Sequence, residues 1–173
     1  MSDRTPSQTI GPFFHEALRW PEGSHVQLAE AGKRIAISGR IVDGAGAPVG
    51  DALVETWQLS PLGRTPKAAR EGSRTYGFAR LETGKDGSFR IETTLPGGDV
   101  PFLDVSIFAR GLLKALRTRV YLVDEARVRG AKLPAALAAS TRLKTLVAVP
   151  AGDAEYRWDV RLQGDGETIF FAF

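Results

Sequence analysis

One arginine stands where two apolar runs meet, and its position calls for an explanation. The runs cover residues 103–109 and 116–123, and Arg110 ends the first of them directly before Gly111. A guanidinium at the end of a buried run is costly unless it meets an anion or stays in water. Arg110 is therefore a candidate for binding an anion. The alternative is a structural ion pair, either with Glu55 or with a carboxylate across an interface.

Other chemistry is scarce in this chain. It has no cysteine, which rules out disulfides, thiolate metal sites and a cysteine nucleophile. Its two histidines, His15 and His25, have no tyrosine nearby and make a poor metal site. No phosphate loop is present, and Gly164-x-Gly166 is expected to be a turn because no helix follows it. The residues alone indicate a binding or interaction module without an assigned reaction.

Length and composition indicate one globular domain. The 173 residues are 43% apolar and 25% charged, which suffices for a substantial core. A net charge of +3, spread along the chain, argues against nucleic-acid binding. The first residues lack an apolar signal region, and no window approaches the roughly 18 apolar residues of a membrane span. A cytoplasmic protein with no membrane contact is expected.

The first 30 residues are expected to form an arm. Two prolines and a glycine within residues 5–14 prevent a continuous helix there. The same segment holds Ile10, Phe13 and Phe14, which are too apolar for a solvated tail. We therefore expect the arm, residues 1–30, to pack on something, in this chain or in a partner.

From Lys33 onwards, alternating apolar and polar residues predict β-strands. Strands are expected at 34–42, 52–59, 77–81, 88–93, 146–149, 156–162 and 168–171, with a hairpin turn at 83–87. The stretch around Arg110 fits a helical stripe as well, but its β-branched residues favour two strands around a turn. Leu103, Val105, Ile107 and Ala109 would then face one side and Arg110 the other.

The predicted fold is all-β, an antiparallel β-sandwich with an N-terminal arm and one or two short helices. Residues 31–173 would form its single domain. A short helix is expected within 124–143, with Pro134 in its first turn. On the strand 52–59, Glu55 shares a face with Trp57, and a buried glutamate there would need an arginine partner.

Five segments resemble the intradiol ring-cleavage dioxygenases. They are Thr5-Pro-Ser-Gln-Thr-Ile-Gly-Pro-Phe-Phe14, Val54-Glu-Thr-Trp-Gln58, Ile107-Phe-Ala-Arg-Gly111, Thr118-Arg-Val-Tyr-Leu-Val-Asp-Glu125 and the run 156–171. The first and last of these are similar to the alpha subunit of family members that are built from two kinds of chain. The resemblance extends from the arm to the end of the sequence.

The resemblance implies an αβ enzyme with a non-haem Fe(3+) ion. Such an enzyme inserts both atoms of O₂ into 3,4-dihydroxybenzoate and cleaves the ring between the hydroxyls, giving 3-carboxy-cis,cis-muconate. In this family the beta subunit holds the iron through two tyrosines and two histidines, one pair of ligands being a His-x-His on a strand. Here that strand reads Phe102-Leu103-Asp104, Thr65 stands at the first tyrosine, and the loop 95–99 has no tyrosine.

The resemblance therefore implies a chain that binds no metal, is inactive alone and works in a higher αβ hetero-oligomer with a beta subunit. Its substrate-binding residues would be Arg110, Thr9, Gly11, Pro12 and Phe13. The four arm residues would cover the beta-subunit site, and Arg110 would face the substrate carboxylate. A charge-assisted hydrogen bond of that kind contributes about 1.5–3 kcal/mol.

Departures and alternatives remain. The family often has tyrosine where Phe13 stands, and the loops 60–75 and 95–101 look shorter than in its relatives. The turn 43–51 is common in non-enzymatic β-sandwich carrier or adhesion modules, which is the alternative function. A homomeric catechol dioxygenase would need the missing ligand set and is nearly excluded.

Overall fold

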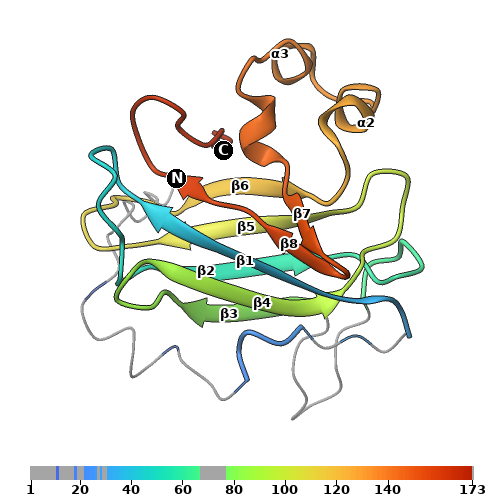
Figure 1. The fold of residues 1–173 in the computed structure, drawn as a ribbon, viewed down its shortest axis with the longest axis horizontal. Coiled ribbons are helices and arrows are strands. Elements are labelled where there is room, and N and C mark those ends of the chain that lie inside the picture. The colour runs from blue at the N-terminus through green and yellow to red at the C-terminus, as the bar shows by residue number, and fades with distance from the viewer. Residues whose placement is uncertain are drawn as a thin grey trace, which may run out of the picture.

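Two β-sheets packed face to face make up the molecule (Figure 1). The computed structural model describes residues 11, 18, 22–26, 28, 31–66 and 77–172. The first sheet has the order β4-β1-β8-β7, with β9 also paired to β1, and the second has the order β3-β2-β5-β6. The first-sheet strands are β1 (Arg34–Val42), β4 (Ser88–Thr94), β7 (Val149–Gly152), β8 (Glu155–Arg157) and β9 (Val160–Arg161). The second-sheet strands are β2 (Leu53–Gln58), β3 (Phe78–Glu82), β5 (Phe102–Phe108) and β6 (Leu116–Tyr121). The predicted β-sandwich is confirmed.

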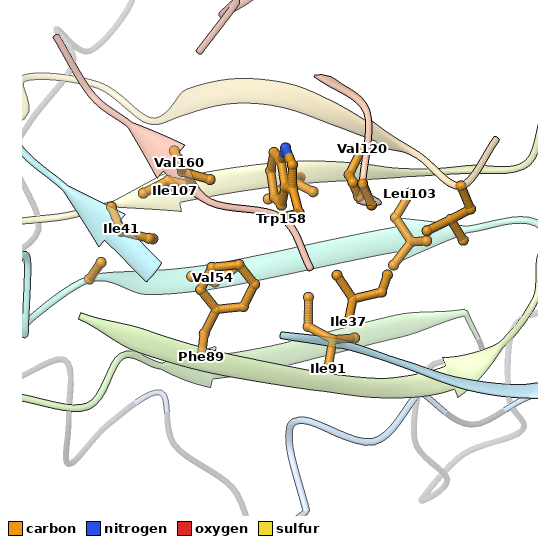
Figure 2. Packing of buried hydrophobic residues seen from close by; sticks show 14 of the residues in the cluster. Ile37, Ile41, Val54, Phe89, Ile91, Leu103, Ile107, Val120, Trp158 and Val160 are labelled. Carbon is orange, nitrogen blue, oxygen red and sulfur yellow. The ribbon is translucent and has the colours of Figure 1, made fainter. Parts of the chain in front are cut away.

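The core follows from the alternation of the strands. On β5, Leu103, Val105 and Ile107 are buried, whereas Asp104 on the opposite face is exposed. The predicted strand pair around Arg110 is therefore confirmed, because β5 and β6 run antiparallel through the expected turn. Figure 2 shows the indole of Trp158 among Ile107, Val120 and Leu103 from the second sheet. Its Nε1 donates to the carbonyl of Thr145 over 2.9 Å.

The first sheet is mixed, because β8 and β9 both run parallel to β1. The strand expected at 156–162 is split between these two segments at Trp158 and Asp159. At this point the backbone of Trp158 lies very close to Gly39 on β1. Only glycine fits there, because a Cβ atom at position 39 would lie 1.7 Å from the carbonyl oxygen of Trp158. The backbone amide of Arg40 donates to the Asp159 carboxylate instead of to a strand partner, over 2.9 Å.

Three short helical segments lie beside β6 at one side of the sandwich (Figure 1). They are α2 (Glu125–Arg129), α3 (Ala135–Ala138) and the 3-10 turn η1 (Leu143–Leu146). Asp124 caps α2 by accepting from the amide of Arg127, and Pro134 is the N-cap of α3. Two α-helices thus stand where one was expected within 124–143. None of the described helices is long and apolar enough to cross a membrane.

Three sequence expectations about turns and strands were wrong. The turn 83–87 forms, with Gly84 donating to the carbonyl of Ser88, but β3 and β4 belong to different sheets and do not make a hairpin. The strand expected at 146–149 begins only at Val149, because Leu146 lies in η1.

The third error concerns the closing segment 168–171, which makes only an isolated bridge between Phe171 and Arg117. The hydrogen bonds of this segment go to different parts of the sandwich. Thr168 bonds to Arg161, whereas the carbonyl of Ile169 accepts from the hydroxyl of Thr118. A continuous ladder therefore cannot form there.

Part of the N-terminal arm closes one open edge of the sandwich. The carbonyl of Gly23 accepts from Arg80 of β3 over 2.8 Å, and that of Ser24 accepts from Glu92 of β4 over 2.9 Å. The amide of Val26 donates to the backbone carbonyl of Glu92, and the ring of His25 pairs with the side-chain carboxylate of Glu92 over 2.8 Å. Residues 23–26, called the edge clamp below, thus pack on strands of their own chain. Packing of the arm on a partner chain stays a prediction.

Candidate functional site

Arg110 lies on a tight turn at one end of the sandwich. Ala109 is buried, and its carbonyl accepts from the amide of Leu112 over 3.2 Å. Gly111 occupies the third position of this turn with a φ of 85°, a conformation that favours glycine. The side chain of Arg110 is 66% exposed. The sequence Ala-Arg-Gly therefore places a guanidinium in solvent on a stem that is fixed in the core.

The carboxylate that pairs with this guanidinium belongs to Asp51, which precedes β2. The Nε of Arg110 donates to Oδ2 of Asp51. Within the residues that the structure describes, no further hydrogen bond involves the Nη1 and Nη2 nitrogens of Arg110. The turns that carry the two residues lie at the same end of the sandwich (Figure 1). Sequence reasoning missed Asp51, which is 59 positions away from Arg110.

Glu55 has a different partner. Its carboxylate accepts from Nη2 of Arg80 over 2.6 Å, and the side chains are only 17% and 23% exposed. Arg80 is the direct cross-strand neighbour of Glu55 in the register of β2 and β3. The expectation that Glu55 needs an arginine is confirmed, and the alternative that Arg110 is that arginine is wrong.

A second arginine, Arg119, contacts β5, the strand on which the family resemblance places a pair of metal ligands. Arg119 of β6 pairs with Asp104 of β5 over 2.7 Å and lies over the ring of Phe102, 3.7 Å from its centroid. The rings of Phe102 and Tyr121 form a T-shaped pair with their centroids 5.9 Å apart. Asp104 is thus engaged by a cation of its own chain.

The residues that the structure describes do not fit an iron ion. Among the described residues, no group of three or more histidine, cysteine, aspartate or glutamate side chains could hold a metal. His25 is engaged by Glu92 and by the hydroxyl of Ser24, and Tyr121 is buried. Thr65, at the place expected for the first tyrosine ligand, is exposed. We therefore assign no catalytic step to a metal bound by the described part of this chain.

A cleft of about 650 Å³ lies elsewhere, between the edge clamp and the edges of both sheets. Its lining includes four arginines: Arg40, Arg80, Arg90 and Arg157. Each is paired with a carboxylate, namely Asp86, Glu55, Glu155 and Asp159 in the same order. The hydrogen bond from Arg90 lowers the pKa of Glu155, and the same bond raises the pKa of Arg90. Arg110 is paired with a carboxylate too, but its side chain is more exposed than those of these four arginines, at 66% against 23–57%.

The structure describes two of the five residues expected to bind substrate. Arg110 and Gly11 are both exposed. Thr9, Pro12 and Phe13 lie outside the described residues. The contact of all five with a substrate stays a prediction.

Similarity to known proteins covers nearly the whole chain. A model of the Dioxygenase family (Dioxygenase_C) matches residues 11–101. The protocatechuate 3,4-dioxygenase alpha chain of Burkholderia cepacia is 35% identical over 97% of this chain and 96% of its own length. The beta chain from the same organism is 30% identical, over 53% of this chain and 40% of its own length.

A solved structure has a similar fold. The dioxygenase domain of a dioxygenase–carbohydrate-binding protein fusion from Streptomyces sp. SirexAA-E superposes with a TM-score of 0.59 and 25% identity, covering 94% of this chain and 99% of that domain. The family model covers more than half of the chain, and the alpha-chain similarity covers nearly all of it. The chain therefore belongs to the dioxygenase family, together with the protocatechuate 3,4-dioxygenase alpha chains.

Proposed function

We propose that this chain is the alpha subunit of a protocatechuate 3,4-dioxygenase. The enzyme would cleave 3,4-dihydroxybenzoate with O₂ between its two hydroxyls, giving 3-carboxy-cis,cis-muconate. The beta subunit would hold the ferric ion, which supplies the redox chemistry, and this chain would help to line the pocket. Alone it would be inactive, and it would work in a higher αβ hetero-oligomer.

The observation that carries the proposal is the similarity to an alpha chain over almost the full length of both proteins. The similarity to a beta chain is confined to about half of this chain. The division of labour in which the partner carries the metal is part of this proposal.

Within this proposal, Arg110 binds the carboxylate of the substrate. Its exposed guanidinium offers two terminal nitrogens in a plane, which match the two oxygens of a carboxylate. The arm residues Thr9, Gly11, Pro12 and Phe13 would cover the pocket of the beta subunit. The division of the chain into an arm, 1–30, and a sandwich domain, 31–173, is part of the same proposal.

Copurification tests the assignment. The chain is produced with and without its beta partner, and bound iron and O₂ uptake with 3,4-dihydroxybenzoate are measured. We expect iron and activity only in the complex. Iron bound stoichiometrically by this chain alone would contradict the proposal. A stable monomer that never joins a beta subunit would favour a non-enzymatic β-sandwich module instead.

Arg110→Ala in the complex tests the role of the guanidinium. Loss of a charge-assisted bond should raise KM for 3,4-dihydroxybenzoate by roughly 10- to 100-fold. Catechol, which lacks the carboxylate, should be affected much less. Equal losses on both substrates would indicate that Arg110 has only a structural role.

A further inference from the structure

We propose that Asp51 is a positioning residue, which holds the guanidinium of Arg110 so that its two terminal nitrogens face the carboxylate of the substrate. This inference rests on the proposed function. It concerns how the cation is oriented, and it gives Asp51 no contact with substrate.

The stem of Arg110 is fixed, but its guanidinium is not fixed by packing. Ala109 lies in the core, and the turn that follows is closed by the hydrogen bond to its carbonyl. Beyond the stem the side chain is 66% exposed, so the core does not select one rotamer. A long exposed side chain loses conformational entropy when it binds a ligand, and this loss weakens binding. An arginine used for recognition therefore benefits from a second anchor.

Asp51 is placed on a rigid segment that can serve as this anchor. The hydroxyl of Thr83 donates to the carbonyl of Val49 over 2.8 Å and accepts from the amide of Ala52 over 3.0 Å. The amide of Thr83 donates to the carbonyl of Ala52 over 2.9 Å. Gly50 packs so closely that a Cβ atom there would lie 2.8 Å from the carbonyl oxygen of Lys85. The backbone on both sides of Asp51 is thus held by the turn 83–87.

The contact between the two side chains leaves the binding edge open. Asp51 accepts from Nε, on one side of the guanidinium, and its own side chain is only 25% exposed. The Nη1 and Nη2 nitrogens form the other edge and can donate in parallel to two carboxylate oxygens. Asp51 therefore orients the guanidinium without occupying its two terminal nitrogens.

Repulsion between Asp51 and the substrate carboxylate acts in the opposite direction. If repulsion outweighed positioning, removing the charge of Asp51 would tighten substrate binding. The two effects predict opposite changes in KM, so the sign of the change separates them.

The test uses the complex with the beta subunit, with O₂ uptake measured against 3,4-dihydroxybenzoate concentration. Asp51→Asn should raise KM about three- to tenfold and leave kcat within about twofold of the wild type. Asp51→Ser is a second neutral variant with the same expectation. Asp51→Glu keeps the charge, so its KM should lie nearer to the wild type. The matched control is Asp153→Asn, whose carboxylate is 99% exposed, and its KM should not change.

A double variant separates positioning from general damage to the structure. If Asp51 acts through Arg110, then Asp51→Asn combined with Arg110→Ala should have the KM of Arg110→Ala alone. An unchanged or lower KM for the neutral variants, a fall in kcat alone, or additive effects would each overturn the inference. A wild-type complex without ring cleavage would instead contradict the proposed function.

Discussion

Arginines in this chain differ in what surrounds their ion pairs, and the surroundings decide what each pair does. Arg80 and Glu55 are mostly shielded from water, so each needs the other to compensate for its lost hydration. Arg110 is largely exposed, and a pair at that exposure adds little stability. The first pair is therefore suited to holding β2 and β3 together, whereas the second leaves its cation available to a ligand.

Glu55→Gln should destabilise the fold. The variant keeps the shape of the side chain but replaces the carboxylate that faces the shielded guanidinium of Arg80 by a neutral amide, at a cost of about 1–3 kcal/mol in the free energy of unfolding. Urea unfolding of the two proteins measures the difference. Asp153→Asn removes a fully exposed carboxylate and should change the same quantity by less than about 0.5 kcal/mol. Equal effects of the two substitutions would contradict a stabilising role for the pair.

At the scale of elements, alternation predicts the longer strands well because β1, β2, β4 and β5 each bury alternate side chains in the core. The partner of a strand is harder to predict. The turn 83–87 has the glycines of a hairpin, yet its two strands join opposite sheets. Turn residues set the local backbone, whereas the choice between a hairpin and a crossing depends on core packing between both sheets.

In the candidate site, too, single residues could be predicted from the sequence but their partners in the fold could not. Arg110 was found because a charge at the end of an apolar run stands out in the sequence. Asp51 lies in an ordinary turn, and only the fold of β1, β2 and β5 brings it to Arg110. Because Glu55 lies on the same face of its strand as Trp57, its need for an arginine partner could be predicted. That this partner is Arg80 is known only from the register of β2 and β3.

Three strands of the first sheet are linked by side chains on its exposed face. Arg90 of β4 reaches across Ser38 of β1, to which it donates over 3.1 Å, and pairs with Glu155 of β8 over 2.9 Å. The hydrogen bond from Arg90 lowers the pKa of Glu155 below its ordinary value of 4.5. A lowered carboxyl pKa means that the ionised form is favoured by folding.

This link should make stability depend on pH in the acid range. The contribution of Glu155 is fully present above its ordinary pKa of 4.5 and is lost as the pH falls through its lower pKa in the folded protein. Glu155→Gln should therefore lower the unfolding temperature at about pH 6, and the difference should shrink towards about pH 3. Arg90→Gln combined with Glu155→Gln should show no larger acid effect than Glu155→Gln alone. A difference that stays constant across this pH range would contradict the coupling.

At the scale of the whole molecule, the arm has two parts with separate roles. The edge clamp, residues 23–26, bonds to β3 in one sheet and to β4 in the other. It therefore belongs to the sandwich, although it precedes the predicted domain boundary at residue 31. The residues proposed to cover the partner's pocket, Thr9, Gly11, Pro12 and Phe13, come before it in the chain.

Two truncations should separate these roles. Removing residues 1–13 keeps the edge clamp, so the unfolding temperature of the chain should change by less than about 2 °C. The complex with the beta subunit should nevertheless lose roughly tenfold or more in kcat/KM, because the pocket loses its cover. Removing residues 1–26 also removes the hydrogen bonds to Arg80 and Glu92, and should cost about 1–3 kcal/mol in the free energy of unfolding. Full activity after the shorter truncation would show that the arm does not cover the pocket, whereas equal stability of both truncated chains would show that the clamp does not hold the sheet edges together.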